Sequence, residues 1–154
     1  MVRFTIIKTL KKELQELGYK FSTNSDTEVV LKSYMEWGES CLNKFRGMFA
    51  FCIYDKNKRN LFLSRDRFGI KPLLFSFFNE KFIFTSELKL FFNSKIIPIE
   101  LSQESIEDYF YYGSVQQPKT IIKEVYQLMP GCSMNAKIYL RKTFEEATNY
   151  HMVA

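Results

Sequence analysis

The sequence has few histidine and cysteine side chains, the usual ligands of structural zinc. It contains one histidine, His151, and three cysteines, Cys41, Cys52 and Cys132. The cysteines are odd in number and have no C-x-x-C spacing, and a single histidine completes no usual zinc pattern with them. We therefore expect no metal site and no disulfide framework. Buried, reduced thiols are predicted instead, as in a cytoplasmic protein.

Long apolar runs, targeting signals, internal repeats and low-complexity linkers are also absent. No uninterrupted apolar run approaches the roughly 18 residues that a membrane span needs, and the opening residues do not form a signal-peptide pattern. A globule of 154 residues buries about 68 to 70% of its unfolded surface, which is enough for a real core. The sequence predicts one soluble, cytoplasmic domain over 1–154 with no membrane partner.

The chain is instead rich in aromatic residues and positive charge. It has 16 Phe and 9 Tyr and is 46% hydrophobic, which predicts an aromatic core and excludes simple disorder. Its net charge of +5 would suit a phosphate backbone. However, the basic residues are spread over the links between apolar segments, so a solvated basic surface is favoured and nucleic acid is not an expected partner.

Two amphipathic helices are predicted in the first third of the chain. Segment 8–17 carries leucines at helical spacing, and Gly18 follows it as a stop. Ser25 and Glu28 form a capping-box pattern, in which Ser25 accepts from a first-turn amide and Glu28 reaches back to the cap. The apolar stripe of this second helix consists of Val30, Tyr34 and Trp37, and Gly38 is expected to end it.

Four apolar runs follow, separated by short polar links. They span 48–54, 61–64, 73–78 and 82–85. This pattern predicts a strand meander that forms the middle of an antiparallel sheet. The run 48–54 does not alternate apolar with polar residues, so both of its faces should be covered by other layers.

The link between the second and third runs has the sequence RDRFGIKPL over 65–73. Gly69 can adopt a positive φ, and Pro72 fixes the entry into the next strand. Two arginines, an aspartate and a lysine beside a glycine turn indicate a structured, charged corner.

Two further helices and a strand are predicted after the meander. Segment 87–92 should form a short helix, and Ser102 should cap a second one that ends at Gly113. Ile106, Tyr109 and Phe110 would form its buried face, and both helices would cover the sheet. Segment 132–140 is expected to add a final strand.

Several of these segments resemble the glutaminase half of asparagine synthetase, a class II glutamine amidotransferase domain. They are SDTEV at 25–29, GMFAF at 47–51, the corner at 65–73 and FIFTSE at 82–87. Segment 109–131 is also similar, although Met129 stands where the family has the first of two prolines. The resemblance runs from about residue 8 to 140. It implies an α+β fold, an N-terminal-nucleophile (Ntn) type αββα sandwich of antiparallel sheets that is incomplete in this chain.

The resemblance implies one substrate contact, at Asp26. In the family the aspartate of this pattern helps to hold the α-amino group of glutamine. A structural alternative remains open, because a carboxylate in a first helical turn is stabilised by the helix dipole, typically by about 0.3 to 1 kcal/mol. The other polar residues of the matching segments are expected to be structural or interdomain; they are Arg65, Asp66, Arg67, Lys71, Ser86 and Glu87.

No catalytic residue is predicted. The family domain begins with a cysteine whose thiolate attacks the amide while its own α-amino group handles the proton, whereas this sequence begins Met-Val. An unassisted thiol with a pKa of about 8.5 is only a few per cent thiolate at neutral pH, and burial raises the pKa further. The Asn-Gly oxyanion segment of the family aligns with 1–6 and does not match there.

The intact family enzyme hydrolyses glutamine, passes ammonia through a channel and amidates an aspartate activated by ATP and Mg²⁺. The sequence has no Ser-Gly-Gly-x-Asp-Ser pyrophosphate loop, so we expect no cofactor in this chain and no activity from it alone. It would then be a fragment with an exposed sheet edge that favours self-association. The alternatives are a degenerate interaction module, half of a split enzyme with a separate synthetase chain, or a basic nucleic-acid binder.

Overall fold

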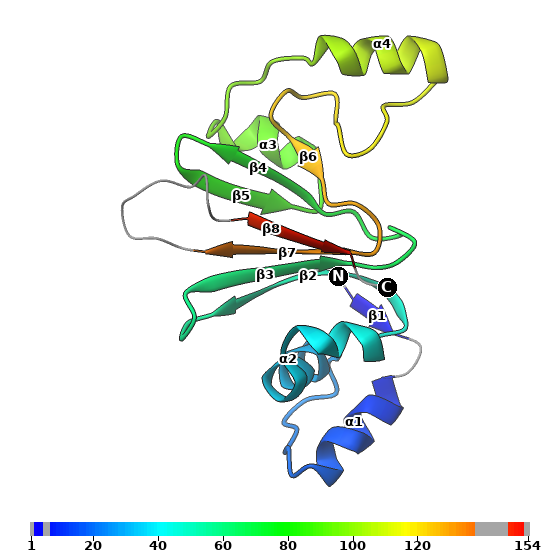
Figure 1. Ribbon diagram of the computed structural model, residues 1–154, viewed down its shortest axis with the longest axis vertical. Helices are drawn as coiled ribbons and strands as arrows, with labels where there is room; N and C mark the ends of the chain where they lie inside the picture. The colour runs from blue at the N-terminus through cyan, green and yellow to red at the C-terminus, as the bar shows by residue number, and fades with distance from the viewer. Residues whose placement is uncertain (1, 5–6, 138–147, 153–154) are drawn as a thin grey trace.

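A computed structural model describes residues 2–4, 7–137 and 148–152, with side chains described for 7–137. Two antiparallel sheets are stacked between helices, in the order helices, sheet, sheet, helices (Figure 1). The five-stranded sheet has the order β1 (Val2–Phe4), β2 (Gly47–Asp55), β3 (Asn60–Arg65), β7 (Cys132–Lys137), β8 (Thr148–Met152). The three-stranded sheet has the order β5 (Lys81–Thr85), β4 (Leu74–Phe78), β6 (Tyr126–Gln127).

The two predicted N-terminal helices are confirmed as α1 (Ile7–Glu16) and α2 (Asp26–Trp37), which is followed by a 3₁₀ segment, Gly38–Lys44. Leu10 and Leu14 of α1 are buried against α2. Ser25 caps α2 by accepting from the Thr27 amide at 3.2 Å. Gly38 ends α2 with φ 57°.

Half of the predicted capping box is wrong. The Glu28 carboxylate accepts from the backbone amides of Ser22 and Thr23, at 3.0 and 2.8 Å, rather than from that of Ser25. The Ser25 amide donates instead to the Thr23 hydroxyl. The chain before α2 therefore folds back over its first turn. Hydrogen bonds to Glu28, first from the Thr23 hydroxyl and then from Ser22, hold its pKa well below the usual range.

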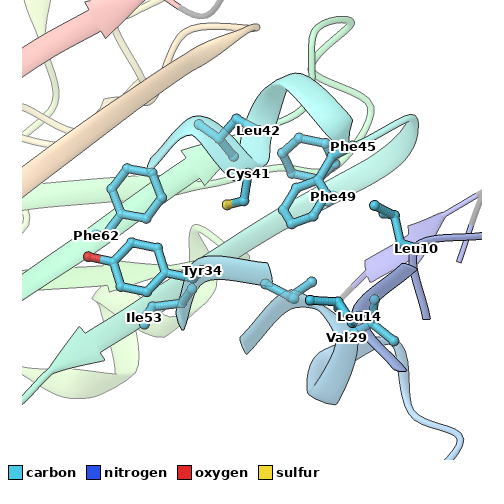
Figure 2. Packing of buried hydrophobic residues seen from close by; sticks show 11 residues of the cluster. Leu10, Leu14, Val29, Tyr34, Cys41, Leu42, Phe45, Phe49, Ile53 and Phe62 are labelled. Atoms are coloured by element: carbon cyan, nitrogen blue, oxygen red, sulfur yellow. The ribbon is translucent and has the colours of Figure 1, made fainter. Parts of the chain in front are cut away.

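β2 is covered on both faces, as its lack of alternation predicted. Phe49 and Ile53 point toward α1 and α2 and pack with Phe62 in the first core cluster (Figure 2). Ala50 and Cys52 point the other way, into the cluster between the two sheets. Successive side chains of a strand alternate between faces, so an uninterrupted apolar run serves two cores.

The prediction of a single meander is wrong. Runs 48–54 and 61–64 lie in the five-stranded sheet, whereas 73–78 and 82–85 lie in the three-stranded sheet. β3 pairs on its second side with β7, which comes from far along the chain, so β4 cannot continue the same sheet. Corner 65–73 therefore carries the chain from one sheet to the other.

The corner is built around the carboxylate of Asp66, which is fully buried. It accepts four backbone N–H groups at 3.0 to 3.3 Å, from Phe49, Phe68, Ile70 and Lys71. The donor on β2 links the corner to the five-stranded sheet, and the other three close the loop on itself. A buried carboxylate needs such donors, because leaving its charge unpaired would be costly.

Arg65 also stabilises the corner, and its charge is opposite to that of Asp66. Its guanidinium donates to the carbonyl oxygens of Gly69, Lys71 and Leu128 at 2.6 to 2.8 Å. Burial lowers the pKa of Arg65, and the Asp66 carboxylate opposes that change. Gly69 has φ 62°, and a Cβ there would lie 2.7 Å from the Pro130 ring. The predicted requirement for glycine is therefore confirmed by both conformation and space.

The two later helices differ in what they cover. The first, α3 (Lys89–Ser94), begins two residues later than expected and buries Phe91 against Leu74 of β4. The second, α4 (Gln103–Tyr112), is capped by Ser102 as predicted, but of its expected buried face only Ile106 is partly buried. Tyr109 and Phe110 are 56% and 82% exposed. The helix contacts the segment around Thr120 through polar side chains instead of packing on a sheet.

The remaining features concern the ends and edges of the sheets. The predicted strand 132–140 is confirmed as β7 up to Lys137, and 138–140 lie outside the described residues. β5 forms an edge of the three-stranded sheet, with Phe84 of that strand 40% exposed. Within 2–4, 7–137 and 148–152, no helix has the length and hydropathy needed to cross a membrane.

Replacing the buried carboxylate tests the corner. We expect Asp66→Asn to lower the free energy of unfolding by about 2 to 4 kcal/mol, because one acceptor oxygen is replaced by an NH₂ group that faces backbone donors. Urea unfolding followed by circular dichroism would measure the change.

The matched control is Asp55→Asn. Asp55 also accepts two backbone amides, from Asn57 and Lys58, but in an exposed turn. We expect a loss of less than about 1 kcal/mol there. Equal losses for the two variants would contradict a special role for the buried corner.

Candidate functional site

A cavity of about 650 Å³ opens beside the junction of the two sheets. β2 contributes three consecutive residues to it, and the end of corner 65–73 and the end of β5 form the other walls. The start of α2 reaches it through Thr27. Its lining consists of Thr27, Ala50, Phe51, Cys52, Lys71, Pro72, Leu73, Phe84, Thr85, Ser86 and Glu87. Apolar walls with a few polar groups are typical of small-molecule sites.

The cavity unites three of the residues singled out from the sequence. Lys71, Ser86 and Glu87 all belong to its lining. They come from the two ends of the β4–β5 hairpin, Lys71 shortly before β4 and the other two directly after β5. The corner and the hairpin thus bring residues 15 or more positions apart in the sequence to one opening.

Asp26 lies next to this cavity in the chain but does not line it. It is the first residue of α2 and is partly buried, while its neighbour Thr27 contributes to the lining. No hydrogen bond to the Asp26 carboxylate is found among the residues whose side chains are described. The position suits either a contact to a positively charged ligand group or a dipole-stabilised first turn.

The remaining three sequence candidates lie elsewhere. Arg65 and Asp66 are buried inside the corner, at 4% and 0% exposure, and do not line the cavity. Arg67 donates to the carbonyl of Phe45 at 3.0 Å and lines a separate cavity of about 360 Å³. Of the seven candidates, three line the cavity of about 650 Å³, Asp26 lies beside it, and three lie elsewhere.

Cys52 is a cavity residue that the sequence predicted only as a buried, reduced thiol. The apolar run 48–54 showed that both of its faces were covered, but it could not show that one face opens into a cavity. The pKa of Cys52 is raised to about 12 by burial. Burial likewise raises the pKa of Cys41 to about 12 and raises that of Cys132. None of the three thiols is activated for attack, because each environment disfavours the thiolate.

The arrangement can hold a small ligand, but its described part lacks a nucleophile paired with a base. Segment 1–6, where the family oxyanion pattern would align, is described only as the backbone of Val2–Phe4, which pairs with β2. Met1, Thr5 and Ile6 lie outside the described residues, as does the side chain of His151. Among the described side chains no cluster of three His, Cys, Asp or Glu could hold a metal.

The two-sheet fold matches that of solved amidotransferases. Glutamine phosphoribosylpyrophosphate amidotransferase from Bacillus subtilis, complexed with ADP and GMP, aligns with a TM-score of 0.61 and 16% sequence identity. The alignment covers 97% of this chain and 27% of that one. The fold is thus the α+β, Ntn-type arrangement of antiparallel sheets that was expected.

The family model for the glutamine amidotransferase domain matches residues 6–150. The chain therefore belongs to the glutamine amidotransferase domain family. Within this family, the chain is similar to two asparagine synthetases from Bacillus subtilis. Asparagine synthetase [glutamine-hydrolyzing] 1 is 40% identical over 122 residues, which is 79% of this chain and 19% of the relative. Asparagine synthetase [glutamine-hydrolyzing] 3 is 36% identical, over 79% of this chain and 20% of the relative. The chain thus spans about a fifth of the length of these relatives.

The raised pKa of Cys52 has a measurable consequence. We expect its alkylation by iodoacetamide at pH 8 to be at least about 10-fold slower than that of a peptide thiol, because the thiolate is scarce. The rate should keep rising above pH 9, since the folded-state pKa is about 12. Mass spectrometry of a variant carrying Cys41→Ser and Cys132→Ser would isolate this thiol.

Unfolding the same variant in urea supplies the control, because it should restore the rate of a peptide thiol. A rate in the folded protein that levels off near pH 7 would mean that Cys52 is an activated thiolate, against the environment described above.

Proposed function

We propose that the chain is the amidotransferase part of an asparagine synthetase. In its intact form such an enzyme transfers the amide nitrogen of glutamine to an ATP-activated aspartate during asparagine biosynthesis. The observation that carries this proposal is the 40% identity with asparagine synthetase [glutamine-hydrolyzing] 1 over 79% of the chain. The cavity beside the start of α2 supports it, because Lys71, Ser86 and Glu87 of two family-like segments meet there.

The 154-residue chain does not hydrolyse glutamine on its own in this proposal. Attack on an amide needs a thiolate or an activated hydroxyl next to a base. The described thiols all have raised pKa values, and none belongs to a residue that could use its own α-amino group as the base. We therefore assign no catalytic residue to the chain.

Asp26 is the residue to which we assign substrate contact, by resemblance to the family. Its position one residue before a lining residue suits a carboxylate that reaches the α-amino group of glutamine at the cavity mouth. Lys71, Ser86 and Glu87 are assigned to the walls of the site. Arg65, Asp66 and Arg67 are assigned structural roles, which their bonds to backbone groups support.

ATP and Mg²⁺ are assigned to the synthetase reaction and not to this chain, and glutamine is the small-molecule partner of the intact enzyme. We place the protein in the cytoplasm, where reduced cysteines are the norm. A second copy of the chain is a further proposed partner, which would pair with the open edge of β5. An unpaired strand edge is a template for another strand.

An interaction module without catalysis is the second candidate function, and the exposed aromatic residues of α4 favour it. In that case the chain would act as one half of a split enzyme or as a degenerate adaptor. A neighbouring reading frame that encodes a synthetase would favour the split enzyme.

The test of the main proposal is ammonia release from glutamine. We expect the purified chain to release none above the level of a triple variant with Cys41→Ser, Cys52→Ser and Cys132→Ser. A coupled glutamate dehydrogenase assay would measure the rate, with asparagine synthetase 1 of Bacillus subtilis as the positive control. Hydrolysis that depends on one of the three thiols would overturn the proposed inactivity.

Asp26 has its own test, in thermal unfolding. A ligand that binds only the folded state raises the melting temperature by mass action. We expect glutamine at about 10 mM, a concentration that detects weak ligands, to leave the melting temperature of wild type and of Asp26→Asn unchanged, because Asp26 is the one family substrate contact carried over to this chain and a single contact binds too weakly. The substitution keeps an oxygen for the first turn, so it should itself cost little. A glutamine-dependent shift in wild type alone would show that Asp26 completes a working site.

A further inference from the structure

A separate cavity of about 360 Å³ opens where the start of β2 meets corner 65–73, and we call it the arginine cavity. None of its lining residues belongs to the cavity of about 650 Å³. Two arginines and no acidic residue are found in its described lining, so it is a positively charged site that the proposed function does not use. The lining consists of Asn43, Arg46, Gly47, Phe49, Arg67 and Phe68.

The two arginines of this cavity are held in different ways. The guanidinium of Arg67 donates to the backbone carbonyl of Phe45 at 3.0 Å, which ties it to the segment just before β2. Arg46 is exposed and has no hydrogen-bond or ion-pair partner among the described residues. One guanidinium is therefore fixed at the cavity wall, while the other can turn toward a ligand.

Aromatic rings form two further parts of the arginine cavity. Phe49 is buried, and its ring packs edge-on against that of Phe45, with 5.7 Å between the ring centroids (Figure 2). Phe68, by contrast, is 84% exposed, more than any other large apolar side chain in the described part of the chain. A flat ring that stacked on Phe68 would remove this apolar surface from water.

The charge and the size of the arginine cavity indicate a phosphate monoester. Guanidinium groups bind phosphates and carboxylates through paired hydrogen bonds. A phosphate monoester carries a charge of about −1.5 to −2 at pH 7 and so matches two arginines, whereas a carboxylate carries a single charge. Pockets for organic ligands have volumes of roughly 300 to 1,000 Å³. The arginine cavity is within this range, so it has room for a ring beside the phosphate.

We propose that the arginine cavity binds a phosphate monoester that carries a flat ring. Arg46 and Arg67 bind the phosphate oxygens, and Phe68 stacks on the ring. Gly47 adds no side chain to the cavity, so the ligand can approach the backbone of β2 there. Nucleoside monophosphates and aryl phosphates share this chemistry. The proposal does not depend on glutamine or on the fate of the synthetase reaction.

Titration of the whole chain, followed by phosphorus NMR of the ligand, tests the proposal. The probes are phenyl phosphate, adenosine monophosphate and inorganic phosphate. We expect at least one of the two esters to bind at least about fivefold more tightly than inorganic phosphate, because only the esters carry a ring. The ester that binds more tightly identifies the source as aryl or nucleoside. Equal affinity for all three probes would overturn the proposal, as would the absence of saturable binding.

Substitutions in the lining separate the roles of charge and ring. Arg46→Gln and Arg67→Gln should each weaken binding of the preferred ester at least about 10-fold, because each removes a charged hydrogen bond to the phosphate. Phe68→Ser should weaken the ester and leave inorganic phosphate unchanged. Urea unfolding checks that each variant is folded. Since no bond of Arg46 is found among the described residues, Arg46→Gln remains informative if Arg67→Gln destabilises the chain.

Arg59→Gln is the matched control. Arg59 is exposed in the turn between β2 and β3, outside the arginine cavity, and its substitution removes the same charge. We expect it to change the dissociation constant of the ester by less than about twofold, because salt screens distant surface charges. An equal loss for Arg59→Gln and Arg46→Gln would mean that the ester binds a diffuse basic surface, which would overturn the proposal.

Discussion

The buried carboxylate of Asp66 is the interaction on which the two-sheet arrangement depends. It binds four backbone amides, one on β2 and three within its own corner, so it fixes the corner to the first sheet while the chain turns toward the second. Arg65 binds three carbonyl oxygens around the same turn, including that of Leu128. In this low-dielectric setting each charge is satisfied mainly by backbone groups, which makes the geometry of the corner specific.

The position of the cavity follows from that corner. The chain leaves the first sheet at Arg65 and enters the second at β4, so Lys71 and Leu73 come to lie beside β2 and opposite the end of β5. A layer of apolar side chains, among them Leu63, Phe75 and Met134, fills the space between the sheets below it. The same burial that stabilises this layer raises the pKa of Cys52 at the cavity wall. The packing that stabilises the core therefore lowers the reactivity of the Cys52 thiol.

The chain combines three buried core clusters with surfaces that its described residues do not cover. Both faces of β2 are buried, and α3 closes the outer face of β4. By contrast, the side chains of Tyr109 to Tyr112 at the end of α4 and the edge at β5 are open among the described residues. The chain belongs to the glutamine amidotransferase domain family, and its asparagine synthetase relatives are about five times as long as the part matched here.

The sequence by itself determined the local elements and the kinship. Periodicity and capping residues predicted α1, α2 and the strands β2 to β5, because these depend on neighbours in the chain. The SDTEV and corner motifs predicted the family, because each is a contiguous stretch of sequence. Only the tertiary structure decided which strands share a sheet, that Cys52 lines the cavity, and that Tyr109 and Phe110 face solvent. Each of these depends on distant partners, such as β7 beside β3 and Thr120 beside α4, which hydrophobic pattern does not encode.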